Sequence, residues 1–314
     1  MIKGTVIKGV GGLYTVRLDS EVNGKVYANV RGRGSFRHEK LVLLTGDRVE
    51  LEPLENDEFF CKKILDRKNS LIRPPLANLD VIFAVIPCVK PMPDLHIVDK
   101  MLCIAEHNGI EPVIIITKAD LDTEFANATY ETYKKCGFST FITSSQNHDG
   151  VEQVLEYIKQ ISTQGAPLCA FAGVSGAGKS TLMNAIFPNL TLETGELSEK
   201  IERGKNTTRH TELFAFDELI GEGHGGYLAD TPGFSLLDFE RFDFFTLEEL
   251  FDTFREFDAS VGKCKYTKCT HTKDEGCDII SRVESGEIPK TRHESYIMLY
   301  EILKKKPTWK SNKK

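Results

Sequence analysis

The sequence predicts a multidomain chain in which a small all-β barrel is followed by an α/β domain with a parallel sheet and by a short helical section. Three observations predict it. Short alternating segments fill the first 70 residues, continuous apolar runs alternate with helical patterns from about residue 79, and a cysteine and histidine cluster lies near the carboxyl end. We place the domain boundaries at 1–70, 71–238 and 239–314. A length of 314 residues suits two or three domains.

The composition is that of a soluble globular protein, with 40% hydrophobic and 27% charged residues. The sequence contains no stretch of about 18 apolar residues and therefore predicts no membrane span. A strand-like pattern begins at Met1 without the apolar core of a signal peptide, so we expect a cytoplasmic protein with reduced thiols. We also expect a monomer. The net charge of −6 combines mildly basic ends with an acidic middle, which suits either a polyanionic partner or ordinary solvated charge.

The first 70 residues predict a small barrel that resembles an OB-fold, because about five short strands in this length are typical of one. The alternating segments, separated by glycine-rich turns, are Thr5–Ile7, Tyr14–Leu18, Lys25–Val30 and Arg48–Glu52. The link before the fourth segment holds five basic residues and one aromatic ring, which suit a nucleic-acid surface or, equally, a solvated loop. These residues are Arg31, Arg33, Phe36, Arg37, His38 and Lys40.

From Leu79 onward, apolar runs alternate with amphipathic segments, and this alternation predicts a parallel, doubly wound sheet. In such sheets ligands bind beyond the carboxyl ends of the strands, so the chemistry is expected where each apolar run ends. The predicted strands are 80–86, 112–116, 140–143, 168–172 and 226–229. The predicted helices are about 94–107, 123–136, 151–161 and 180–187.

A nucleotide phosphate loop follows the strand 168–172. Residues 173–180 are Gly-Val-Ser-Gly-Ala-Gly-Lys-Ser, with the spacing Gly, four residues, Gly-Lys-Ser between a strand and a helix. The glycines let backbone amides surround a phosphate at the start of a helix. Lys179 is expected to contact the outer phosphates and the Ser180 hydroxyl to bind Mg²⁺. The expected nucleotide contacts here are Gly173, Val174, Ser175, Gly176, Ala177, Gly178, Lys179, Ser180 and Thr181.

Three other strand ends carry polar motifs, namely Thr117-Lys118-Ala119-Asp120, Thr143-Ser144-Ser145 and Asp230-Thr231-Pro232-Gly233. Asp120 can accept two parallel N–H bonds from the edge of guanine, whereas adenine would leave the carboxylate partly unpaired. Asp230 is expected to support Mg²⁺, and the Gly233 amide to contact a terminal phosphate. Each motif alone is also an ordinary turn. Together, beside a phosphate loop, they predict a site for GTP or GDP with Mg²⁺.

The cluster near the carboxyl end predicts a zinc site. Three thiolates and one imidazole form a tetrahedral ligand set, and we expect the ion to stabilise a subdomain that lacks a large core. The expected ligands are Cys264, Cys269, His271 and Cys277, and the other cysteines, expected in the core, are Cys61, Cys88, Cys103, Cys136 and Cys169. Helices are predicted at 246–257 and 294–304. A basic tail follows, for which contact with RNA and simple solubility both stay open.

The order of the motifs is unusual, because ordinary GTPases carry the phosphate loop before the base-recognition motif. Here residues 117–120 and the pair Ser144-Ser145 precede Gly173, which is the order of a circularly permuted G domain. With the leading barrel and the trailing cluster, the whole chain resembles the RsgA (YjeQ/YloQ) family of ribosome-dependent GTPases. The resemblance implies hydrolysis of GTP to GDP and phosphate, stimulated by the small ribosomal subunit late in its maturation. It also implies contact with rRNA and one Zn²⁺.

The expected catalytic set is Lys179, Thr208, Asp230 and Gly233, with Ser180, Thr208 and Asp230 at Mg²⁺. Thr207 is the alternative switch threonine. Because Gly233 lies close to the carboxyl-terminal section along the chain, we expect the switch regions to couple the nucleotide state to that section.

Three positions depart from the pattern of related enzymes. Thr117 stands where GTPases generally have Asn, Asn206 where the family commonly has His, and Phe234 where Ras-like enzymes have the Gln that orients water. A phenyl ring cannot orient water, so we expect slow intrinsic hydrolysis and leave the hydrolytic residue unassigned.

Two other interpretations stay open at this point. A nucleotide-regulated RNA-binding module with negligible hydrolysis fits Asn206 and Phe234, and small subunits would not stimulate it. An ATP-dependent enzyme would require that Asp120 not recognise guanine, and it would bind ATP and GTP equally well.

Overall fold

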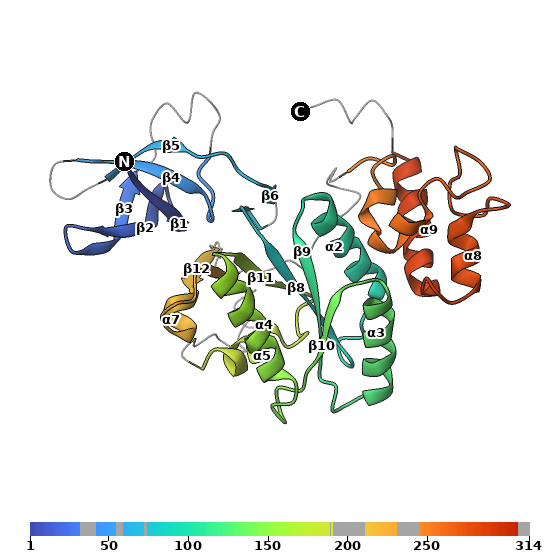
Figure 1. The fold of residues 1–314 in the computed structure, drawn as a ribbon. Coiled ribbons are helices and arrows are strands. Elements are labelled where there is room, and N and C mark those ends of the chain that lie inside the picture. The colour runs from blue at the N-terminus through green and yellow to red at the C-terminus, as the bar shows by residue number, and fades with distance from the viewer. Residues whose placement is uncertain are drawn as a thin grey trace, which may run out of the picture. The chain divides into compact units, whose positions relative to one another are not determined.

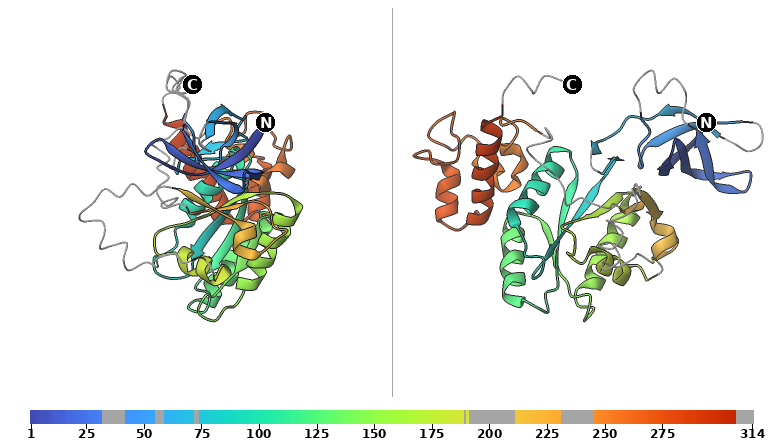
Figure 2. Two further views of the ribbon diagram at one scale, coloured as in Figure 1. Left: turned by 90° about the vertical axis from the view of Figure 1, so that its left-hand side faces the viewer. Right: turned by 180° about the vertical axis from the view of Figure 1, so that it is seen from behind.

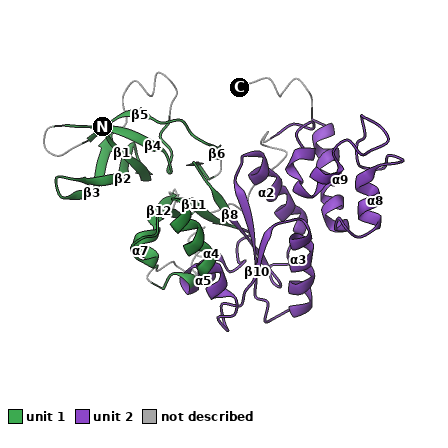
Figure 3. Ribbon diagram, in the orientation of Figure 1, with its two compact units in different colours: residues 1–81, 155–172, 186–234 green, residues 82–154, 173–185, 235–314 purple. Residues whose placement is uncertain are grey.

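The computed structural model describes residues 1–31, 42–54, 59–71, 74–188, 190, 211–230 and 245–306 (Figure 1). The chain divides into two compact units (Figure 3). Unit 1 comprises residues 1–81, 155–172 and 186–234, and unit 2 comprises residues 82–154, 173–185 and 235–314. Unit 1 therefore joins the barrel with some strands of the α/β region, and unit 2 joins the other strands with the carboxyl-terminal region.

The amino-terminal strands form a closed five-stranded barrel, as predicted (Figure 2). They are β1 (Ile2–Val10), β2 (Leu13–Val22), β3 (Lys25–Arg31), β4 (Arg48–Pro53) and β5 (Phe59–Ile64). The order β1-β2-β3-β5-β4 closes through antiparallel β1–β4 pairing, while β3 and β5 run parallel. The interior holds alternate side chains such as Val6, Val16 and Leu51.

The fifth strand has no clear alternating pattern in the sequence, and the structure shows the reason. The register between β4 and β5 shifts between Glu50 and Leu51, which is a β-bulge or a similar irregularity. Lys62 and Lys63 are both exposed there, so the period of two is lost.

The rest of unit 1 extends the sheet from the barrel. Strand β11 (Leu168–Ala172) runs parallel to β13 (Tyr227–Asp230), β13 pairs antiparallel with β12 (Glu212–Ala215), and β12 pairs with β1 where Lys8 meets Glu212. Helix α7 (Phe216–Ile220) follows β12, and the short strands β6 (Ser70–Leu71) and β7 (Leu76–Ala77) form a separate pair. The predicted strands at 168–172 and 226–229 are confirmed; β12 is too short for its period to show in the sequence.

In unit 2, β9 (Glu111–Thr117) lies between β8 (Val81–Pro87) and β10 (Ser139–Ile142), and β10 runs parallel to β9. All residues of β8 are buried, which explains its unbroken apolar sequence. The helices of the α/β region are α2 (Leu95–His107), α3 (Thr123–Lys135), α4 (Val151–Gln164), which ends in unit 1, and α5 (Lys179–Ile186). Asp94 and Asp122 cap α2 and α3 by accepting backbone N–H bonds of 3.0 and 2.9 Å.

The carboxyl-terminal region departs from the prediction at one place. The predicted helix at 246–257 is wrong as a continuous α-helix, because the segment forms turns and the 3₁₀ helices η3 (Phe251–Thr253) and η4 (Arg255–Ser260). Phe251, Phe254 and Phe257 recur every three residues, a spacing that aligns side chains on a helix of three residues per turn. The last helix, α9, spans Lys290–Lys304 and so begins before the predicted residue 294, and α8 (Asp278–Glu284) was not predicted.

This region also contains a larger hydrophobic core than the sequence suggested. Phe254, Phe257, Ile279, Tyr296 and Leu299 are among its buried members, and two residues of α2 complete it. The five scattered cysteines are all buried, as predicted. Burial raises the pKa of Cys61 and of Cys88 to about 11, so these thiols stay protonated.

A buried ionic network joins α2 and α3 to the carboxyl-terminal region within unit 2. Arg292 of α9 is 0% exposed and donates to Glu256 at 2.7 Å and to Asp99 of α2 at 2.6 Å. Asp99 also accepts from the Tyr133 hydroxyl at 3.0 Å and from Ser295 at 2.5 Å. Burial disfavours the charge of Arg292, but the two carboxylates outweigh it and raise its pKa well above the ordinary value. None of the helices in the described part of the chain is both long and apolar enough to cross a membrane.

Candidate functional site

The phosphate loop, residues 173–180, has the backbone that its glycines predict. Gly173, Gly176 and Gly178 have φ angles of 153°, 78° and 93°, which side-chain-bearing residues rarely adopt. A Cβ atom on Gly173 would lie 2.6 Å from the carbonyl oxygen of Val85. Gly178 accepts a bond of 2.8 Å from the Leu182 amide in the first turn of α5. The loop therefore leads directly into a helix start, where backbone amides and the helix dipole favour an anion.

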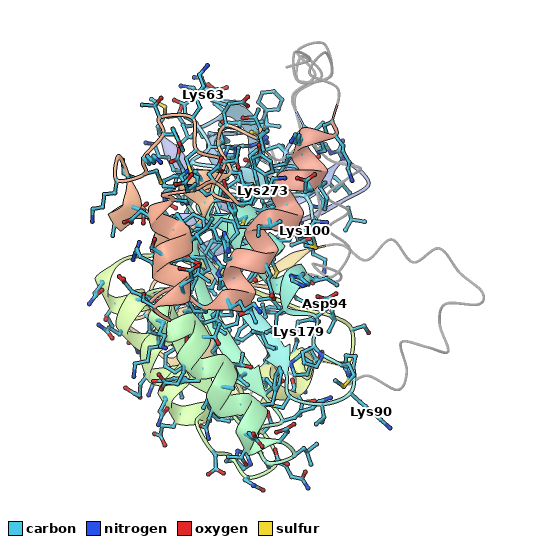
Figure 4. The ribbon with its side chains drawn as sticks, turned by 90° about the vertical axis from the view of Figure 1, so that its right-hand side faces the viewer. Lys63, Lys90, Asp94, Lys100, Lys179 and Lys273 are labelled. Carbon is cyan, nitrogen blue, oxygen red and sulfur yellow. The ribbon has the colours of Figure 1, made fainter. Side chains whose placement is uncertain are left out.

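The Lys179 ammonium lies within the curve of this loop. Its Nζ donates to the carbonyls of Gly173 at 2.7 Å and Val174 at 3.0 Å. Burial lowers the pKa of Lys179, because the ammonium is poorly hydrated. A phosphate placed beside Nζ would compensate that charge (Figure 4 labels Lys179).

The loop predicted to recognise the base, residues 117–120, contacts the phosphate loop directly. Thr117 is 2% exposed, and its hydroxyl donates to the Ala177 carbonyl at 2.7 Å. Lys118 adopts a φ of 59°, and its Nζ donates to the Gly176 carbonyl at 2.9 Å. Thr117, which stands where GTPases generally have Asn, thus contacts the phosphate loop through its hydroxyl. Asp120 is exposed beside these contacts.

A third loop packs against the base-recognition loop. The Ala119 amide donates to the Thr143 carbonyl at 3.2 Å, and the Thr143 hydroxyl donates to Ile116 at 3.0 Å. Ser144 bonds through its amide to Asp149 at 2.9 Å, which folds the loop back after β10. The structure therefore brings together three of the predicted motifs, at 117–120, 143–145 and 173–181, within unit 2.

One contributor to this site was not predicted. Lys118 Nζ also donates to the Lys90 carbonyl at 2.5 Å, in the loop that follows β8. Pro91 of this loop lies 3.4 Å from the position of a Cβ atom on Gly176. Lys90 points away from its loop in Figure 4. The run of prolines after β8 indicated a loop, but nothing local indicated its partner.

The other residues predicted for the nucleotide site either belong to unit 1 or lie outside the residues that the structure describes. Asp230 is the last residue of β13 in unit 1, in register with Glu212 of β12. Several predicted or discussed positions lie outside the described residues, namely Arg33, Phe36, Arg37, His38, Lys40, Asn206, Thr207, Thr208, Thr231, Pro232, Gly233 and Phe234.

The four predicted metal ligands converge in unit 2. The ligand atoms of Cys264, Cys269, His271 and Cys277 all lie within 4.8 Å of one another. The His271 Nδ1 atom is 3.5 Å from the sulfur atoms of Cys264 and Cys277, which are 3.9 Å apart. A tetrahedron with Zn–S of about 2.3 Å and Zn–N of about 2.0 Å has S···S and S···N edges of about 3.8 and 3.5 Å. The donor set and its spacing therefore fit zinc.

Neighbouring groups hold this ligand loop in position. His293 Nε2 donates to the His271 carbonyl at 2.7 Å, and the Tyr296 hydroxyl donates to the Thr270 carbonyl at 3.1 Å. The Asp278 amide donates to the Cys264 sulfur at 3.4 Å. Burial lowers the pKa of His271, which favours the neutral ring that binds a metal.

Comparisons with known proteins match nearly the whole chain to proteins of one family, RsgA. The family model described as RsgA GTPase matches residues 64–240, and that described as RsgA N-terminal domain matches residues 3–59. The small ribosomal subunit biogenesis GTPase RsgA of Bacillus subtilis is 38% identical over 315 residues, covering 98% of this chain and 100% of that protein. A relative of the same name from Geobacillus is 38% identical over 310 residues, covering 98% of this chain and 99% of its own.

Two solved structures are similar over nearly the whole chain. YjeQ from Thermotoga maritima has a TM-score of 0.79 and 31% identity, with coverage of 98% of this chain and 99% of that one. YloQ, described as a circularly permuted GTPase, has a TM-score of 0.75 and 34% identity, with coverage of 98% and 97%.

Proposed function

Because this chain belongs to the RsgA GTPase family, we propose that it hydrolyses GTP to GDP and phosphate in the biogenesis of the small ribosomal subunit. The observation that carries this proposal is a pair of hydrogen bonds. Thr117 and Lys118, in the proposed base-recognition loop, donate to carbonyls of the phosphate loop. That arrangement holds an exposed carboxylate, Asp120, at a fixed place relative to a phosphate cradle, as guanine nucleotide binding requires.

The residues of the site divide the work between binding and charge stabilisation. Asp120 accepts the guanine N–H groups, while the amides of residues 173–178 and the Lys179 ammonium hold the phosphates. Ser180, Asp230 and Thr208 are the proposed Mg²⁺ ligands or supports. The ion, when bound, neutralises charge on the phosphate oxygens. Gly233 and Thr208, in the two switch segments, are proposed to contact the terminal phosphate and to couple the nucleotide state to the carboxyl-terminal region.

The protein without ribosomal subunits is expected to hydrolyse GTP slowly, and the small subunit is proposed to complete its catalytic site. Without subunits, we expect turnover within the range of about 10⁻⁴ to 10⁻² per second that unaided GTPases show. Added small subunits are expected to raise it, and Lys179→Ala to lower the stimulated rate at least about 100-fold because the phosphate charge loses its partner. Phosphate release with and without subunits measures both effects. Absence of stimulation would favour the RNA-binding module, and Asn206→His tests whether the family's usual histidine raises the rate.

Asp120 is expected to decide the choice of base. Asp120→Ala should weaken GTP and GDP binding about 100-fold, because it removes two charge-assisted bonds, while weak ATP binding stays unchanged. Titration with fluorescent nucleotides measures the affinities. Glu124→Ala, which removes an exposed carboxylate from the first turn of α3, is the matched control. Equal loss in both variants, or equal ATP and GTP affinity in the unmodified protein, contradicts guanine recognition.

Zinc is proposed to occupy the cluster of Cys264, Cys269, His271 and Cys277. Four protein ligands leave no open coordination position, so the ion's role is structural. Ribosomal RNA is proposed as the surface that the protein meets on the small subunit.

A further inference from the structure

The outer face of β2 and β3 has the residues of an oligonucleotide-binding surface. Arg17 and Tyr27 are direct partners across the two strands, and Thr15 lies opposite Asn29 on the same face. The alternate residues Val16 and Ala28 point into the barrel core. In OB-folds this face binds oligonucleotides, through cations for phosphates and aromatic rings for bases.

In this chain, acidic residues from β12 and α7 occupy that face within unit 1. Arg17 Nη2 pairs with Asp217 at 2.5 Å, and the Tyr27 hydroxyl donates to Glu218. At the edge of the face, Lys8 pairs with Glu212 at 2.7 Å. These three contacts give Lys8, Arg17 and Tyr27 carboxylate partners, which are negatively charged oxygen acceptors like those of a phosphate.

These contacts leave two polar atoms without a hydrogen-bond partner among the described residues. Arg17 Nε and Asp217 Oδ1 are buried, and neither has a hydrogen-bond partner within the described part of the structure. Lys8 and Glu212 are 41% and 38% exposed, so water and salt weaken that pair. Asp217 bonds only Nη2 of Arg17 and leaves Nε without a partner in the part of the chain that the structure describes. A phosphate has enough oxygens to accept from both Nε and Nη2 of an arginine.

We propose that α7 mimics a nucleic-acid backbone and covers the β2–β3 face until single-stranded RNA displaces its carboxylates. The inference rests on the proposed function for its RNA partner. The Thr45 hydroxyl of the barrel also donates to the Thr211 carbonyl at 3.2 Å, so the chain that leads into β12 and α7 has a further contact with the barrel.

The test compares the RNA affinity of the unmodified protein with that of a variant in which the carboxylates Asp217 and Glu218 of α7 are replaced by neutral amides. The full-length variant Asp217→Asn/Glu218→Gln should bind a single-stranded 12-nucleotide polyuridine RNA about five- to tenfold more tightly than the unmodified protein, measured by fluorescence anisotropy at fixed salt. Glu222→Gln, which removes the same charge just beyond α7, is the matched control and should leave affinity unchanged. Adding Arg17→Gln to the double variant should abolish the gain.

Unchanged or weaker binding by the double variant overturns the proposal, as does a gain that survives Arg17→Gln. Far-UV circular dichroism must show equal folding, and if the double variant unfolds, Glu218→Gln alone should still tighten RNA binding. Polyglutamate that competes as well as RNA would assign the face to an acidic protein and overturn the choice of RNA. Stimulation of GTP turnover by small subunits distinguishes failure of this inference from failure of the proposed function. If subunits stimulate turnover but the double variant does not bind RNA more tightly, only this inference is rejected.

Discussion

Removing the proposed zinc ion is expected to unfold residues 261–276 while α8 and α9 stay folded. No residue from Val261 to Gly276 is buried, so this segment has no hydrophobic core of its own. Structural zinc contributes on the order of 10 kcal/mol to the folding of such segments. Chelation, or Cys269→Ser, should therefore expose the backbone amides of Thr270 and His271 to hydrogen exchange, together with loss of about one bound zinc per chain.

The helices around the loop should respond differently. They pack around Phe254, Phe257, Tyr296 and Leu299, which are buried side chains and are not themselves metal ligands. Cys88→Ser, which changes a buried thiol far along the chain from the cluster, should leave both zinc content and loop protection unchanged. Loss of protection throughout α9 on chelation would contradict the prediction and show that zinc holds the whole region.

Arg292→Met is expected to destabilise unit 2 by about 3–5 kcal/mol. The substitution removes the cation that pairs with both Asp99 and Glu256, which are 1% and 8% exposed, and so leaves two uncompensated buried carboxylates. Urea unfolding monitored by hydrogen exchange in α2 and α9 measures the loss.

An exposed pair on the same helix provides the control. Lys290 and Glu294 lie 3.8 Å apart with side chains 81% and 50% exposed, so Lys290→Met should cost less than about 0.5 kcal/mol. Replacing Arg292, Asp99 and Glu256 together by apolar residues should recover part of the loss, because no unpaired charge then remains. Equal effects of Arg292→Met and Lys290→Met would mean that the buried network does not hold the two regions together.

Several parts of the fold could be predicted because their signals are local. The buried strands at 80–86 and 112–116 follow from unbroken apolar runs, and the strand–loop–helix at 173–180 follows from glycine spacing. The cluster of candidate metal ligands follows from four cysteine and histidine residues within a short segment. Prediction fails where local signals conflict. Residues 246–257 include residues that favour an α-helix, but their phenylalanines recur every three residues, and the segment forms turns and 3₁₀ helices.

The sequence by itself determined which motifs this protein carries and the permuted order in which they occur, and from these motifs the phosphate, base and metal contacts are proposed. Only the tertiary structure decided which distant residues meet. Lys118 joins Lys90 to Gly176, Arg292 joins Asp99 to Glu256, and the acids of α7 cover Arg17 and Tyr27. The physical reason is that local spacing sets backbone conformation, whereas charge pairing depends on strands and helices that pack together only after the whole chain has folded.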